Sequence, residues 1–129
     1  MKTLAIIAHD ARKQDALEWA VFNKDTLAKF NLVGTKGTSE AVNNVTGLQI
    51  KALGHGPDGG DIVIASEVLQ GKIDMVFFLI DARTPHGHEH DIQTLIRICV
   101  LKNIPLALNR KSADYLISSV MMENVRRKS

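Results

Sequence analysis

Five apolar runs of strand length alternate along this chain with five stretches of helical periodicity, and no other feature restricts its fold as strongly. The apolar runs TLAIIA, NLV, LQIKAL, IDMVFFLI and IPLALN occupy residues 3–8, 31–33, 48–53, 73–80 and 104–109. Helical spacing of apolar residues follows each run, at residues 12–30, 38–46, 62–70, 92–99 and 112–122. This order predicts one three-layer α/β domain over residues 1–129, with a mostly parallel five-stranded sheet and helices on both faces.

The chain is short and close to electrically neutral. It has 129 residues, of which 45% are apolar and 23% charged, as expected for one globular domain with one core. The net charge is +2, and Arg126, Arg127 and Lys128 supply more positive charge than that, so the rest of the chain is slightly acidic. We therefore do not expect a nucleic-acid-binding surface.

The chain contains a single cysteine, so an intramolecular disulfide is impossible. Cys99 falls on the apolar face of an expected helix, where a packed thiol is expected rather than a nucleophile. The first residues do not form a signal-peptide pattern, and no apolar run is long enough to span a bilayer. We expect a cytoplasmic protein with no membrane partner.

The unusual residues gather in the loops that follow the five strands. These loops are residues 9–13, 34–38, 54–61, 81–91 and 109–112. In parallel α/β sheets, ligands bind at the carboxyl ends of the strands, which is where these loops lie. Two of the loops contain glycine-rich turns that open a helix, GTKGTS and GHGPDGGD. Such turns present backbone N–H groups beside the positive end of the helix dipole, an arrangement that binds phosphate or carboxylate.

The side chains around the first turn also suit an anion. Lys13 and Lys36 add positive charge, Thr35 adds a hydroxyl donor, and Gly34 opens the turn. A plain turn would explain GTKGTS equally well if it stood alone. The prediction of an anion site therefore rests on two such loops at one edge of the sheet.

Four aspartates stand at the ends of strands or the starts of helices. Asp10, Asp61 and Asp91 each precede an expected helix, where the ordinary role of an acid is to cap the helix. Taken singly, each is expected to be an N-cap. Asp61 is the best exception, because it follows GPDGG, whose glycines let the backbone approach a ligand closely. Asp81 ends the most apolar strand, a common place for a catalytic or orienting acid in this architecture.

Histidines are dense in the same loops. His55, His86, His88 and His90 lie on two of them, and His9 follows the first strand. A histidine close to a carboxylate supplies acid–base chemistry near neutral pH, so a shared pocket is expected.

The alternation of His86, His88 and His90 permits a zinc site with Asp91 or Asp81 as a further ligand. Proline and glycine around the three histidines argue against the fixed strand that this site would need. We therefore expect no metal.

Several of these segments, in order, resemble the methylglyoxal synthase family. They are AHDARKQ, GTKGTSEAVNNVTGLQI, GPDGGD, HEHDIQTLIR and IPLALN. The similarity extends over nearly the whole chain in one register. It implies conversion of dihydroxyacetone phosphate to methylglyoxal and inorganic phosphate without a metal or organic cofactor. It also implies a homo-oligomer, usually a hexamer.

The resemblance also implies roles for individual residues. Asp61 matches the catalytic aspartate that abstracts the proton beside the carbonyl, and His88 matches the histidine that stabilises the carbonyl oxygen and shuttles protons. Asp10, Asp81 and Asp91 match further acids near the site. The residues that match phosphate and substrate contacts are His9, Lys13, Gly34, Thr35, Lys36, His55 and Gly56.

The chain departs from the family pattern close to the substrate. The pattern has threonine at Val33 and Lys36, serine at His55 and glutamine at Ile62. It usually has proline at three further positions, which are Ala82, Gly87 and His90. Many members have a carboxyl-terminal segment that carries an arginine, and in this chain that segment is shorter.

These departures leave two rival functions open. One is a non-catalytic phosphate- or ligand-sensing domain of the same fold, which would retain the anion site without turnover. The other is plain isomerisation of the same triose phosphate, which would share the proton abstraction and differ only in retaining phosphate.

Overall fold

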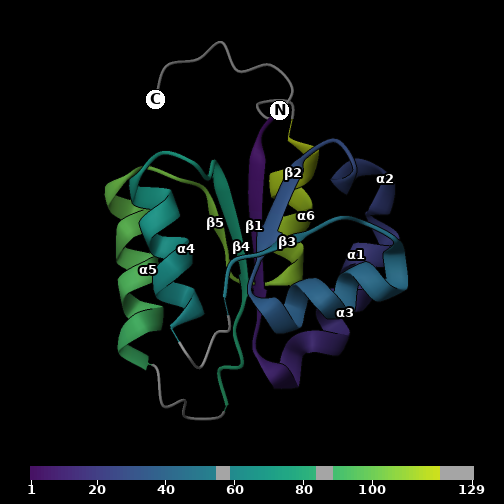
Figure 1. Cartoon of the computed structure of the whole chain (residues 1–129), viewed down its shortest axis with the longest axis horizontal. Coiled ribbons are helices and arrows are strands. Elements are labelled where there is room, and N and C mark those ends of the chain that lie inside the picture. Colours follow the sequence, from purple (N-terminus) through teal and green to yellow (C-terminus); the bar gives the residue numbers. More distant parts are fainter. Residues whose placement is uncertain (55–58, 84–88, 120–129) are drawn as a thin grey trace.

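The sheet is entirely parallel and has the strand order β3-β2-β1-β4-β5. A computed structural model describes residues 1–54, 59–83 and 89–119 (Figure 1). The strands are β1 (Thr3–Ala8), β2 (Asn31–Gly34), β3 (Lys51–Ala52), β4 (Met75–Leu79) and β5 (Leu106–Ala107). The predicted five-stranded parallel α/β fold is confirmed.

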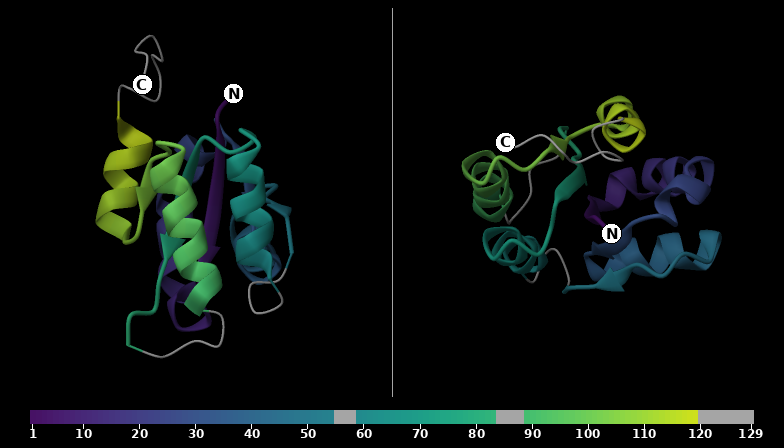
Figure 2. Two further views of the ribbon diagram at one scale, coloured as in Figure 1. Left: turned by 90° about the vertical axis from the view of Figure 1, so that its left-hand side faces the viewer. Right: turned by 90° about the horizontal axis from the view of Figure 1, so that it is seen from above.

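Helices cover both faces of this sheet, which gives three layers (Figures 1 and 2). They are α1 (Lys13–Phe22), α2 (Lys24–Leu27), α3 (Lys36–Thr46), α4 (Gly60–Leu69), α5 (Glu89–Leu101) and α6 (Arg110–Ser118), with a 3-10 turn η1 at Asp10–Arg12. One apolar core joins α1, α3 and α6 to the sheet, and a second joins α4 and α5 to its other face. The neighbours Phe77 and Phe78 on β4 point into opposite cores, as the alternation along a strand requires.

Several segments differ from the expected lengths; the strand expected at 104–109, for example, is limited to Leu106–Ala107. The helix expected at 12–30 is broken at Asn23, whose side-chain amide donates to the Trp19 carbonyl at 2.9 Å and closes α1. The strand expected at 48–53 is limited to β3, because the backbone of Ile50 bonds to the side chain of Asn43. Asn43 accepts from Ile50 N at 2.8 Å and donates to Ile50 O at 3.0 Å.

The order of the strands reverses between β1 and β4, which are paired neighbours. The chain moves outward from β1 to β2 and β3, then returns to place β4 on the other side of β1. Such a reversal leaves the carboxyl ends of the two central strands bordering a gap between helices, where α/β proteins bind ligands. The residues that follow β1 and β4 therefore stand where a ligand is expected to bind. Among the described residues, no helix is both long and apolar enough to cross a membrane.

Candidate active site

Lys13 lies at the carboxyl edge of the sheet with its ammonium group directed at the end of β1. Its Nζ donates to Ala8 O at 3.2 Å and to Asp10 Oδ1 at 2.7 Å. A Cβ atom added at Gly37 would lie 3.1 Å from Lys13 Cε and 3.4 Å from Nζ. The charged group is thus packed against the first turn of α3, where a side chain larger than that of glycine would press on the end of Lys13.

The first turn of α3 supplies the backbone donors of an anion site. Thr35 is the N-cap, and Lys36 is the first residue of the helix. The N–H of Lys36 donates to Gly54 O at 2.6 Å. The N–H groups of Gly37 and Thr38 belong to the orphan donors of a helix start, which have no carbonyl partner within the helix. The Lys36 side chain is exposed, whereas Thr35 is 4% exposed.

Thr38 is a residue of this site that sequence reasoning missed. Its Oγ1 accepts from Ala8 N at 3.1 Å and lies 3.4 Å from Ala8 O, to which it donates. The Thr35 hydroxyl donates to the same Oγ1 at 3.2 Å. The Ala8 carbonyl therefore accepts from both Lys13 and Thr38. Through Thr38 it also positions Thr35, which, like Lys13, is predicted to bind the anion. The sequence did contain a sign of this role. Thr38 comes three residues after Thr35, and residues at that spacing lie next to each other at the start of a helix.

Asp61 is buried at the start of α4. It is 1% exposed and lies in the first turn of a helix whose N-cap is Gly59, at φ 94°. Its carboxylate therefore stands near the positive end of the helix dipole. A Cβ added at Gly54 would lie 3.5 Å from Gly60 Cα, so the end of β3 touches the start of α4. Since Gly54 also bonds to Lys36, the starts of α3 and α4 are neighbours.

The N-cap prediction for the three aspartates is wrong. Asp10 is the first residue of η1, Asp61 the second of α4 and Asp91 the third of α5, so each stands inside its element. The glycines before Asp61 start α4 earlier than its apolar periodicity suggests, because Gly59 adopts a left-handed backbone at the cap. The carboxylate of Asp61 is thereby moved from the cap into the buried first turn.

Two further predicted acids lie at the same edge in different surroundings. The Asp10 side chain is 96% exposed, and its carboxylate pairs with Lys13. Asp91 is partly buried at the start of α5. Asp10 is therefore a partner of the lysine at the rim rather than a buried group.

His9 and Asp81 meet just beyond the carboxyl ends of β1 and β4. The backbone N–H of Asp81 donates to His9 Nδ1 at 2.9 Å, and the N–H of His9 donates to Leu79 O at 3.2 Å. The His9 ring also packs edge-on against Phe78, with ring centroids 5.2 Å apart. Asp81 is 8% exposed, and its carboxylate accepts from Arg83 N at 3.1 Å.

Three predicted site residues, His55, Gly56 and His88, lie outside the described residues, as does His86 of the zinc alternative. His90 lies within α5 and is exposed. Within the described ranges, no group of three histidine, cysteine or acidic side chains is arranged to hold a metal.

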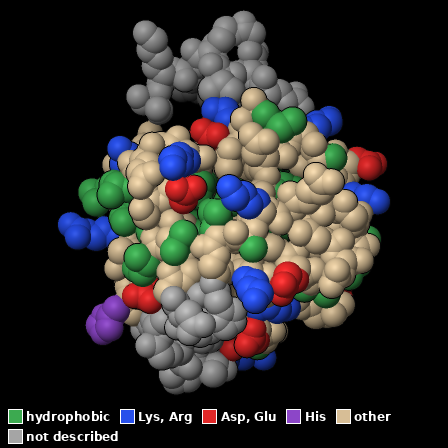
Figure 3. Space-filling view, viewed as in Figure 1, with side chains coloured by type: hydrophobic (Ala, Val, Ile, Leu, Met, Phe, Trp, Pro, Cys, Tyr) green, Lys and Arg blue, Asp and Glu red, His purple; other side chains and the backbone are tan. Residues whose placement is uncertain are grey.

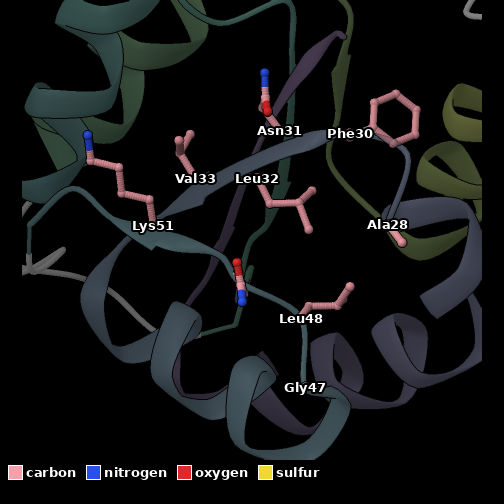
Figure 4. Close-up of a pocket in the computed structure, with 9 residues that line it drawn as sticks. Ala28, Phe30, Asn31, Leu32, Val33, Gly47, Leu48 and Lys51 are labelled. Atoms are coloured by element: carbon pink, nitrogen blue, oxygen red, sulfur yellow. The ribbon is translucent and has the colours of Figure 1, made fainter.

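A cavity of about 550 Å³ opens beside the amino half of β2, away from this cluster (Figure 4). It is lined by Ala28, Phe30, Asn31, Leu32, Val33, Gly47, Leu48, Gln49 and Lys51. The cavity exists because β3 pairs only with Val33 and Gly34 and leaves the start of β2 uncovered. Its lining mixes apolar side chains with Asn31, Gln49 and Lys51, and it includes none of the residues predicted to bind the anion.

Comparison with known proteins assigns the chain to a family. Residues 15–108 match the model of the MGS-like domain family. The methylglyoxal synthase of Clostridium botulinum is 42% identical over 114 residues, which cover 88% of this chain and 96% of that protein. The chain belongs to the methylglyoxal synthase family.

Other members of the methylglyoxal synthase family agree over similar lengths. The protein of Thermus thermophilus is 41% identical over 118 residues, covering 92% of this chain and 94% of that one. The crystal structure of methylglyoxal synthase from Elizabethkingia anophelis superposes with a TM-score of 0.90 at 32% identity, covering 99% of this chain and 92% of that chain. The resemblance seen in the sequence motifs is confirmed.

Proposed function

We propose that this chain is a methylglyoxal synthase that converts dihydroxyacetone phosphate to methylglyoxal and inorganic phosphate. The observation that carries the proposal is a buried carboxylate, Asp61, in the first turn of α4. Gly54 links the start of that helix to the first turn of α3, against which Lys13 packs. The reaction needs two parts, a group that accepts the proton and a site that binds the phosphate. The relatives of similar length are themselves named methylglyoxal synthases.

The phosphate group binds where the backbone donors and the cation converge. Lys13 supplies charge, the N–H groups of Gly37 and Thr38 supply directed donors, and Thr35 supplies a hydroxyl. Holding the phosphate in place fixes the reacting carbons relative to the base.

Asp61 then removes a proton from the hydroxymethyl carbon beside the carbonyl. The electron pair of that C–H bond moves to the carbonyl oxygen and gives an enediolate. The hydroxyl group of the enediolate then loses its proton and becomes the aldehyde carbonyl, and the carbon–carbon double bond shifts to the terminal carbon. Phosphate leaves with the electron pair of the broken carbon–oxygen bond and takes up the hydroxyl proton. Return of the proton to the terminal carbon gives the methyl group of methylglyoxal. By family resemblance His88 donates to the carbonyl oxygen, and Asp81 and Asp91 support the groups around it.

The comparisons do not favour the sensing-domain alternative. Two relatives that are named methylglyoxal synthase match this chain over 96% and 94% of their own length. A sensing domain would also have no need of a nearly fully buried aspartate beside its anion site, because a buried carboxylate repels an anion. We further propose, from the family resemblance, a homo-oligomer of six subunits that acts in the cytoplasm.

The decisive experiment is an assay of methylglyoxal and phosphate release from dihydroxyacetone phosphate. Wild type is compared with Asp61→Asn and with the control Asp25→Asn, which alters an exposed acid in the first turn of α2. Loss of the base should lower kcat by about 10²- to 10⁴-fold, while the control stays at the wild-type rate. Isomerisation without phosphate release would support the rival reaction, and a folded wild type without turnover would support the sensing domain.

A further inference from the structure

The cavity beside the amino half of β2 has an outer wall that is fixed by hydrogen bonds (Figure 4). β3 begins at Lys51, opposite Val33, so the start of β2 has no strand beside it. Just before β3, the side chain of Asn43 accepts from Ile50 N at 2.8 Å and donates to Ile50 O at 3.0 Å. These two bonds hold the chain on its course along the wall, so the opening is a built feature of the fold rather than a frayed strand end.

A backbone donor of β2 faces this cavity. Asn31 N donates to Lys2 O, on the β1 side, at 2.8 Å. Gly34 O accepts from Leu53 N, on the β3 side, at 2.8 Å. Successive residues of a strand direct their peptide groups to opposite sides, so Leu32 directs its N–H to the same side as Gly34. No described strand residue stands opposite that N–H, because β3 pairs only with the last two residues of β2.

The side chains around this N–H divide the cavity into an apolar part and a charged part. Leu32 belongs to the first core, and Phe30 and Leu48 pack against that core. The side chains of Asn31 and Lys51 lie on the other side of β2 (Figure 4). Lys51 is exposed, and within the described part of the chain it forms no ion pair. An apolar surface and an ammonium group, with an N–H between them, match an organic anion.

We propose that this cavity binds a small organic carboxylate with an apolar body the size of one ring. One carboxylate oxygen accepts from Leu32 N–H, and the other lies at the Lys51 ammonium group. The apolar body packs on Leu48 and Phe30. A cavity of about 550 Å³ is large enough for such a molecule. Inorganic phosphate would occupy only the charged part, so the apolar part makes the site selective for an organic acid.

This proposal does not rest on the proposed function, because the cavity includes none of the residues predicted to bind the substrate phosphate. A wild type that released no methylglyoxal would leave it unaffected, and the tests below need no turnover.

The first test titrates deuterated, ¹⁵N-labelled protein with 3-phenylpropionate and with its uncharged amide, 3-phenylpropanamide. We expect the backbone N–H signal of Leu32 to move with the acid, and the amide to bind about fivefold more weakly because it has no charge for Lys51. Inorganic phosphate should not displace the acid. A Leu32 signal that stays in place, or equal affinity for acid and amide, would overturn the proposal.

The second test locates the site with matched variants. Lys51→Met removes the ammonium group but keeps the length of the side chain, so it should weaken binding of 3-phenylpropionate about fivefold. Ala28→Leu fills the cavity from an exposed position and should abolish binding. Lys102→Met, at an exposed lysine after α5, is the control and should bind as the wild type does. Unchanged binding in both cavity variants would place the ligand elsewhere and overturn the proposal.

A second copy of the chain is the other occupant that these titrations reveal. In that case the Leu32 signal would move when the protein alone is diluted, and 3-phenylpropionate would bind only to the diluted protein. That result would overturn the proposal and identify the cavity as an interface between copies.

Discussion

At the scale of single residues, Thr38 connects the predicted phosphate contacts to the sheet. Its buried hydroxyl bonds to both backbone groups of Ala8 and accepts from Thr35. Lys13 bonds to the same Ala8 carbonyl. A change at Thr38 should therefore disturb substrate binding although the residue is 1% exposed.

Replacing Thr38 by valine keeps its shape and removes the hydroxyl. Ala8 N–H then loses its acceptor inside the protein, which costs about 1–3 kcal/mol. We expect Thr38→Val to raise KM for dihydroxyacetone phosphate about tenfold with a smaller change in kcat, in steady-state assays. Thr38→Ser restores the hydroxyl and should recover most of the affinity. Loss of affinity in Thr38→Ser but not in Thr38→Val would show that the methyl group, not the hydroxyl, matters.

The Cys99 thiol is completely buried in the α4–α5 core, as predicted, and burial raises its pKa from 9.0 to about 11. A raised pKa favours the protonated thiol in the folded state, so its contribution is fully present below pH 9 and is lost as the pH rises towards 11. Between pH 8 and 11 the wild type should lose about 2 kcal/mol more unfolding free energy than Cys99→Ala. Urea unfolding of both proteins across this range measures the difference, and parallel curves would contradict it.

At the scale of elements, β1 and β2 approach most closely at Gly34, the last residue of β2. A Cβ at this position would collide with the carbonyl oxygen of Ile6 on β1 and lie 3.0 Å from Ser39 Oγ. Both neighbours are buried, and the carbonyl belongs to a central strand. The glycine is thus required by the packing of two strands and the start of α3.

We expect Gly34→Ala to lower the unfolding free energy by about 3 kcal/mol, because the strands must separate to admit the methyl group. Gly71→Ala is the matched control. Gly71 has φ 79° but open space around it, so alanine there should cost only about 1 kcal/mol of backbone strain. Guanidinium unfolding compares the two, and equal losses would exclude the close approach of the strands as the cause.

At the scale of the whole molecule, two cores share one sheet and should unfold together. Trp19 reports on the first core: it is 1% exposed, donates to Asp114 Oδ1 at 2.8 Å and packs on Phe77 with ring centroids 4.6 Å apart. Leu95 lies in the second core, on the opposite face of the sheet, and is also fully buried. A cavity made at Leu95 therefore tests whether the faces are coupled.

Leu95→Ala should lower the unfolding free energy by about 3 kcal/mol. The Trp19 fluorescence transition should move to the same denaturant midpoint as the loss of helical circular dichroism. Leu101→Ala, on the same helix but at a leucine that is 66% exposed, should change stability by less than about 0.5 kcal/mol. A Trp19 transition that stays at the wild-type midpoint in Leu95→Ala would mean that the two cores unfold independently.

The charges of the molecule agree with its near-neutral composition. Over the face shown in Figure 3, basic side chains are interspersed with acidic ones rather than gathered into one patch. This face gives a nucleic acid no continuous basic track.

The sequence alone determined the elements and their class. Each observed strand lies within one of the apolar runs, although β3 and β5 are shorter than their runs. Gly47 and Gly71 follow the helices α3 and α4, at φ 76° and 79°. These features depend on local sterics and on the period of apolar residues, which can be read directly. The family motifs likewise marked Asp61, Lys13 and His9 without any knowledge of their neighbours.

Only the tertiary structure decided which of these residues meet. The bond between Asp81 and His9 spans 72 positions of the chain, and that between Thr38 and Ala8 spans 30. Each depends on β1 lying between β2 and β4, a choice made by the packing of helices on both faces of the sheet. The spacing of apolar residues does not reveal the order of the strands, because every buried parallel strand has a similar apolar pattern.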